Sequence, residues 1–104
     1  MGMELAETVY KLTEKFPVTE RYGLTQQVQR ASVSVPSNIA EGAYRNSDKE
    51  FKYFLGIAAG SAGEVYTQLE LACRLGYLNR ETTDAVLDHA DMMKRMIFNF
   101  QKQL

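Results

Sequence analysis

The chain has 104 residues, of which 45% are apolar and 24% charged, and its formal net charge is −1. This composition predicts one globular domain over residues 1–104, without the global charge that would attract nucleic acid or an acidic membrane surface. The single cysteine excludes an intramolecular disulfide, and no apolar run approaches the roughly 20 residues of a membrane span. We therefore expect a cytoplasmic protein that does not associate with a membrane.

The first predicted element is a helix that stops at Phe16. Apolar residues are spaced by four, three and four positions, the pattern of one helix face: Leu5, Val9, Leu12 and Phe16. Pro17 disfavours a helical conformation of the residue before it, so we expect the helix to end there.

The second element contains the segment RASVSVPSNIAEG, residues 30–42, which has two interpretations. Read as a strand, residues 31–35 alternate apolar and polar before Pro36. If the segment is instead part of a helix that begins at Leu24, the apolar residues of that helix fall within a wedge of about 80° around its axis. Nothing else in the chain resembles a strand, and a lone buried strand would leave its backbone N–H and C=O groups unpaired. We therefore predict a helix that is kinked at Pro36, and that Gly42 ends or loosens.

Polar residues of this second helix form a stripe beside its apolar wedge. The stripe consists of Arg30, Ser34, Asn38, Glu41 and Arg45. One interpretation is a solvated helix face with a Glu41–Arg45 ion pair. The other is a polar contact surface that faces another subunit, a partner or a phosphate backbone.

The third and fourth helices carry the longest apolar patterns. From Phe51 to Ala72, apolar residues alternate at spacings of four and three over three heptads, and the same spacing continues from Val86 to Leu104. Ser47 is expected to cap the third helix in a reciprocal capping box with Glu50, Gly76 to end it and Asn79 to cap the fourth. The third helix also contains Gly56, Gly60 and Gly63, whose cost in helix propensity suggests that a neighbouring helix approaches closely there.

Chemical motifs are absent from the sequence. The single histidine, His89, has no partners at a recognisable metal spacing, and no nucleophile stands beside a recognisable base and orienting acid. We expect neither a metal nor a cofactor, and we expect that the protein is not an enzyme.

The sequence resembles a known bacterial family. The motif PSNIAEG at residues 36–42, followed by Arg45, Ser47, Glu50 and Phe51, is similar to the four helix bundle proteins also called intervening-sequence proteins, because some are encoded inside inserts of large-subunit ribosomal RNA genes. The resemblance covers nearly the whole chain. It implies an all-α, antiparallel up-down four-helix bundle related to the accessory variability determinant of diversity-generating retroelements. It also implies ring assembly, commonly as pentamers, and an accessory role associated with RNA or a reverse transcriptase, without catalytic residues.

Two functional hypotheses follow from the charge pattern and the resemblance. Residues 21–54 carry five basic against three acidic side chains, a local excess of two. In the first hypothesis the protein binds RNA or DNA, and a ring repeats the basic residues Arg30, Arg45, Lys49 and Lys52. In the second it is an oligomeric module that binds a protein partner, and these residues form ion pairs between subunits.

Apolar residues outside the main stripes predict assembly with copies of the same chain. They are Val33 and Ala40 in the second helix, Tyr53, Phe54 and Ile57 in the third, and Leu87, Met96 and Phe98 in the fourth. Monomers seldom expose a large contiguous apolar patch, so we expect a cyclic homo-oligomer. The number of subunits, five, is what the resemblance implies.

Overall fold

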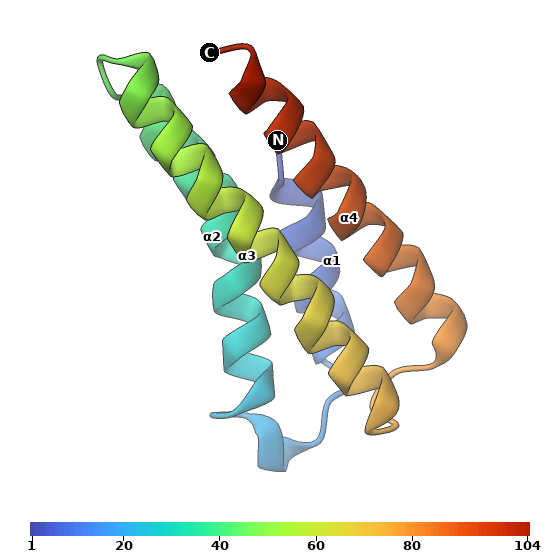
Figure 1. Cartoon of the computed structure of the whole chain (residues 1–104). Helices are drawn as coiled ribbons and strands as arrows, with labels where there is room; N and C mark the ends of the chain where they lie inside the picture. The colour runs from blue at the N-terminus through green and yellow to red at the C-terminus, as the bar shows by residue number, and fades with distance from the viewer.

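The computed structural model describes residues 1–104 and is entirely helical, which confirms the predicted four-helix fold. The elements are α1 (Met3–Thr13), a 3-10 turn η1 (Val18–Glu20), α2 (Leu24–Ala43), α3 (Asp48–Arg74) and α4 (Arg80–Lys102). Successive helices run in opposite directions, and α3 lies between α2 and α4 (Figure 1). No helix is long and apolar enough to pass through a lipid bilayer.

The proline-containing segment is helical throughout. Pro36 lies inside α2, and residues 31–35 belong to the same helix, so the helical interpretation is correct and the strand interpretation is wrong. The apolar wedge faces the interior: Leu24, Val28, Ala31 and Val35 are buried and Ile39 is half-buried. Burial of this face against residues of α1, α3 and α4 offsets the loss of the backbone hydrogen bond that proline cannot donate.

Local signals set both ends of α3 and the start of α4. The Ser47 hydroxyl accepts a hydrogen bond from the Glu50 amide at 3.2 Å, and the Asn79 side chain accepts one from the Thr82 amide at 2.7 Å. Gly76, with φ of 86°, ends α3, and the Tyr77 amide donates to the Ala72 carbonyl at 2.9 Å. The predicted end of the first helix is wrong by three residues, because α1 ends at Thr13 and single turns continue the chain to Phe16.

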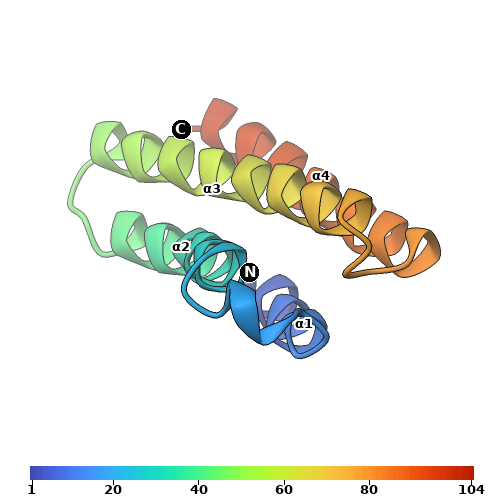
Figure 2. The ribbon, with the colours of Figure 1, turned by 90° about the horizontal axis from the view of Figure 1, so that it is seen from below.

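The core has two parts because α1 is much shorter than the other helices. α1 has 11 residues and α3 has 27, and α1 begins with Gly2 packed beside Val35 and Pro36, halfway along α2. One cluster of fourteen buried residues includes the apolar face of α1 and the residues around it, whereas a second cluster of seven, including Leu55 and Ile97, comes from α2, α3 and α4 alone. Seen from below, α1 and α2 form a layer beneath α3 and α4 (Figure 2).

Glycines have different roles in the two helix pairs. A Cβ atom at Gly42 would lie 2.9 Å from the Phe51 ring and 3.0 Å from Cβ of Phe54, so Gly42 allows α2 and α3 to pack closely before the turn. Around Gly60 and Gly63, by contrast, no atom lies within 4 Å of such a Cβ. The predicted close approach is therefore wrong for these two glycines within a single chain.

Two carboxylates link the connecting segments to the bundle. Glu20 accepts hydrogen bonds from the Leu24 amide at 3.1 Å and from the Tyr77 hydroxyl at 2.8 Å, which joins η1 to the α3–α4 connection. Glu70 of α3 accepts from Arg80 at 2.7 Å and from Arg74 at 2.8 Å, which fastens the start of α4 to the end of α3.

These contacts predict a loss of stability in acid. Hydrogen bonds from Arg80 and Arg74 lower the pKa of Glu70 to about 2. Because this pKa lies below that of the unfolded chain, the contribution of Glu70 is complete above pH 4.5, the ordinary value for the group, and disappears as the pH falls towards 2.

We expect urea titrations between pH 6 and pH 2.5 to show a smaller decline in stability for Glu70→Gln than for the unmodified chain. Glu7→Gln, which changes an exposed carboxylate of α1 without an ion pair, is the control and should retain the full decline. Equal pH profiles for Glu70→Gln and the unmodified chain would contradict this role.

Candidate nucleic-acid interface

The polar stripe of α2 lies along its contact with α3. The Ser34 hydroxyl oxygen accepts hydrogen bonds from the Asn38 side-chain amide and from the Ser61 hydroxyl, both at 2.8 Å. Ser34 and Asn38 are half-buried, whereas Arg30 and Glu41 are exposed. The middle of the stripe is therefore an internal polar contact between two helices, and only its margins face solvent.

Arg45 is held by several neighbours. Its guanidinium lies 3.5 Å from a Glu41 oxygen and 3.6 Å from a Glu50 oxygen, and it stacks 4.9 Å from the centre of the Phe54 ring. The predicted Glu41–Arg45 pair is confirmed. Glu50 contacts Arg45 and makes no hydrogen bond back to Ser47, so the expected capping box is only half formed. Two carboxylates compensate the charge of Arg45, which leaves it little net attraction for a phosphate.

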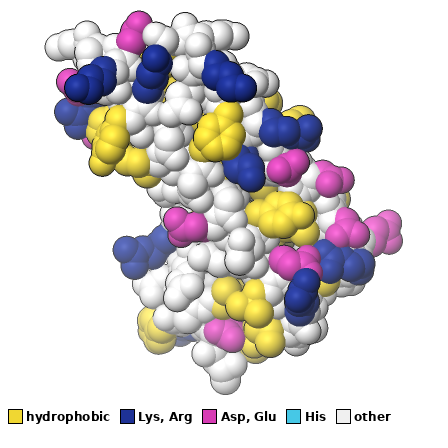
Figure 3. All heavy atoms as spheres, in the orientation of Figure 1, with side chains coloured by type: hydrophobic (Ala, Val, Ile, Leu, Met, Phe, Trp, Pro, Cys, Tyr) yellow, Lys and Arg dark blue, Asp and Glu magenta, His cyan; other side chains and the backbone are white.

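Lys49 and Lys52 are exposed and form no ion pair in the chain. The Lys52 carbonyl accepts a hydrogen bond from the Gln101 side chain at 2.8 Å, which places the end of α4, with the exposed Lys102, beside the start of α3. Figure 3 shows Lys and Arg side chains gathered over this end of the molecule. Arg45 is compensated, so we call only Lys49, Lys52 and Lys102 the basic end.

Sequence reasoning found two of the three members of the basic end, Lys49 and Lys52, and missed Lys102. Lys102 stands about 50 residues along the chain from the others, and only the antiparallel arrangement of α3 and α4 brings it close. The other two predicted contacts lie outside it: Arg45 is paired with Glu41 and Glu50, and Arg30 lies in the N-terminal half of α2.

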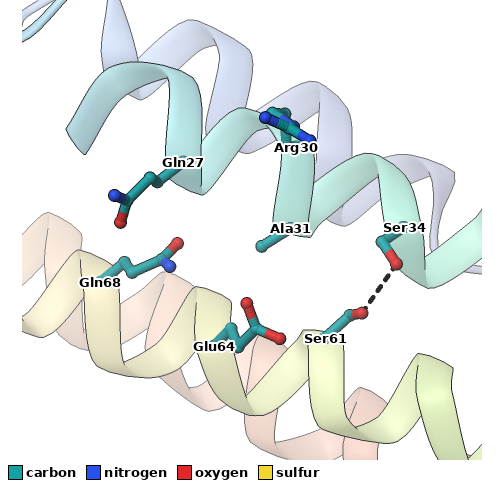
Figure 4. Close-up of a pocket in the computed structure, with 7 residues that line it drawn as sticks. All are labelled: Gln27, Arg30, Ala31, Ser34, Ser61, Glu64 and Gln68. Atoms are coloured by element: carbon teal, nitrogen blue, oxygen red, sulfur yellow. Dashed lines mark hydrogen bonds between the residues drawn. The ribbon is translucent and has the colours of Figure 1, made fainter. Parts of the chain in front are cut away.

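Arg30 instead borders a polar groove between α2 and α3 (Figure 4). The groove has a volume of about 370 Å³, and its polar side chains are Gln27, Arg30, Ser34, Ser61, Glu64 and Gln68. Neither Arg30 nor Glu64 forms an ion pair, and the side-chain oxygen of Gln68 is buried without a hydrogen-bond donor. No group of three or more His, Cys, Asp or Glu side chains converges as a metal ion would require.

Fold and surface together define a small helical-bundle protein with exposed, unpaired lysines at one end and a polar groove between two helices. The profile of the 23S rRNA-intervening sequence protein family matches residues 1–99, so the chain belongs to that family, as the PSNIAEG motif indicated. No protein with a curated description matches the chain.

A solved structure has the same fold. It is the 1.70 Å crystal structure of a protein of unknown function from the S23 ribosomal protein family of Bacteroides thetaiotaomicron VPI-5482. The two chains are 25% identical and superpose with a TM-score of 0.85, over 97% of this chain and 94% of the other.

Proposed function

We propose that this protein is a non-enzymatic, cytoplasmic accessory protein that binds RNA or DNA through its basic end. The observation that carries the proposal is the pair of exposed lysines, Lys49 and Lys52, which have no acidic partner and lie beside Lys102. Membership of a family named for ribosomal RNA intervening sequences supports it. A reverse transcriptase or another enzyme that works on nucleic acid is a compatible partner, as the resemblance to retroelement accessory proteins implies.

Repetition of the basic end in a cyclic homo-oligomer would supply the field that a chain of net charge −1 lacks. Exposed apolar side chains support such an assembly: Val33 of α2, Tyr53 and Ile57 of α3, and Met96 and Phe98 of α4 are each at least 37% exposed. Of the other residues predicted to be in excess, Ala40 is exposed and Phe54 is half-buried. Leu87 is 5% exposed and belongs to the core, so the prediction is wrong for that residue. The proposed number of subunits, five, follows from the family resemblance.

Binding should depend steeply on salt, because each phosphate contact releases condensed counterions. In anisotropy titrations with structured RNA, single strands and duplex DNA, Lys52→Ala should reduce the slope of log affinity against log salt by about 0.7 to 0.9 for each phosphate that Lys52 neutralises. Lys15→Ala, at the opposite end of the bundle, is the matched control and should leave the slope unchanged. No binding to any nucleic acid at about 10⁻⁴ M protein and low salt would contradict the proposal.

A second candidate function is a homo-oligomeric module that binds a protein partner and no nucleic acid. The ion pairs of Arg45 with Glu41 and Glu50 favour it, since they show part of the basic excess compensated within the chain. No binding of nucleic acid at low salt by the unmodified chain, Lys52→Ala or Lys15→Ala would support this candidate against the first.

A further inference from the structure

Hydrogen-bond acceptors in the groove between α2 and α3 lack donors. The Gln68 side-chain oxygen is buried and unpaired, and Glu64, one helical turn earlier on α3, has a carboxylate without an ion pair. Figure 4 shows the Gln68 amide opposite that of Gln27, with their oxygens towards each other, and the Glu64 carboxylate directed into the space between the helices. Ser34 and Ser61, at the far end of the groove, already bind each other. The groove therefore offers hydrogen-bond acceptors to an occupant that brings N–H or O–H donors.

The positive charge of Arg30, at the edge of the groove, limits which chemical groups can bind there. Arg30 borders the same groove from α2 and has no acidic partner. A guanidinium or ammonium group would suit Glu64 and Gln68, but it would place a second positive charge near Arg30. A nucleotide combines the two required features, because its base edge carries donors and its phosphate carries negative charge.

Among the bases, guanine matches the acceptors best. Its Watson–Crick edge presents N1–H and the 2-amino group side by side, which is the arrangement that a carboxylate accepts with both oxygens, whereas uracil presents one such donor. The second hydrogen of the 2-amino group remains for Gln68. No aromatic side chain lines the groove, so a base would be held by its edge and not by stacking, and edge contacts distinguish one base from another.

We propose that the groove between α2 and α3 binds a single unpaired guanine nucleotide, with Glu64 and Gln68 accepting hydrogen bonds from the base edge and Arg30 contacting the phosphate. This site rests on the proposed nucleic-acid function and adds base selectivity to it. The basic end attracts the strand without regard to sequence, and the groove selects the base.

Anisotropy titrations of the full chain test the site with labelled oligouridines that contain one guanine, inosine or adenine at the centre. The guanine strand should bind about tenfold more tightly than the inosine strand, which lacks the 2-amino group, and than the adenine strand. Glu64→Gln preserves the size of an exposed side chain and should abolish this preference. Glu7→Gln on α1 is the matched control and should preserve it.

Arg30→Ala should weaken all three strands and lower the salt slope by about 0.7, while the ratio between guanine and inosine remains. Salt-dependent binding without a base preference would overturn the groove site and leave the proposed function intact. The groove site would also be overturned if Glu64→Gln raised the affinity for all three strands equally, because the carboxylate would then act only by repelling phosphates. Binding to no strand would overturn both proposals.

NMR spectra of the Gln68 side-chain amide test the same groove with small probes. Shifts on addition of arginine amide, but not of guanosine monophosphate, would overturn the nucleotide site and assign the groove to a peptide.

Discussion

Leu55→Ala and Leu69→Ala are expected to lower the free energy of unfolding by about 2–5 kcal/mol each, the range for removing a buried leucine side chain. Both leucines lie on α3 and are 0% exposed. Leu69 belongs to the cluster that surrounds α1, and Leu55 to the cluster that α2, α3 and α4 form alone. A small domain has a total stability of about 5–15 kcal/mol, so either substitution removes a large part of it.

Urea denaturation followed by circular dichroism measures this effect, and Leu71→Ala is the matched control. Leu71 lies on the same helix but is 47% exposed, so its truncation should cost far less. If Leu71→Ala lowered the free energy of unfolding as much as Leu55→Ala, the buried face of α3 would differ from the one in the structure. If Leu55→Ala left the free energy of unfolding unchanged while Leu69→Ala lowered it, the cluster formed by α2, α3 and α4 would contribute little to stability.

Features that depend on neighbours in the sequence were predictable. The caps at Ser47 and Asn79 each depend on a contact over three residues, and Gly76 needs only its own positive φ to end α3. The helical nature of residues 31–35 was also predictable, because the apolar wedge extends through Pro36 and a lone strand has no partner. The end of α1 was not, because single turns after Thr13 continue the apolar spacing as far as Phe16.

Features that depend on how the helices pair were not predictable in the same way. The polar stripe was visible in the sequence, but its contact with Ser61 depends on the rotation of α3 against α2. Gly42 was expected only to end or loosen a helix, whereas its role is to let Phe51 and Phe54 approach α2. Glu64 and Gln68 carry no motif, and they became candidates only when the structure showed that they line one groove with Arg30.

The proposed assembly predicts a large difference between the mass of the particle in solution and the mass of one chain. Light scattering or sedimentation across a concentration series should give a mass several times the 11.8 kDa of one chain, and close to five times if the family resemblance extends to subunit number. Ile57→Glu should dissociate the assembly, because it would bury an unpaired carboxylate between subunits, while the fold of each chain remains because Ile57 is 37% exposed. Met3→Glu, at a 63% exposed apolar position of α1, which carries none of the residues predicted to drive assembly, is the control.

Gly60→Ala separates the effect of assembly from the effect on a single chain. In an isolated chain the added methyl group meets nothing within 4 Å, so the improved helix propensity should stabilise α3 by up to about 1 kcal/mol. If a helix of another subunit lies against Gly60, the same methyl group should weaken association while the dissociated chain gains stability. A mass of 11.8 kDa at every concentration would contradict the assembly. The proposed binding of nucleic acid would then depend on the lysines of one chain, and its salt slope would be correspondingly shallow.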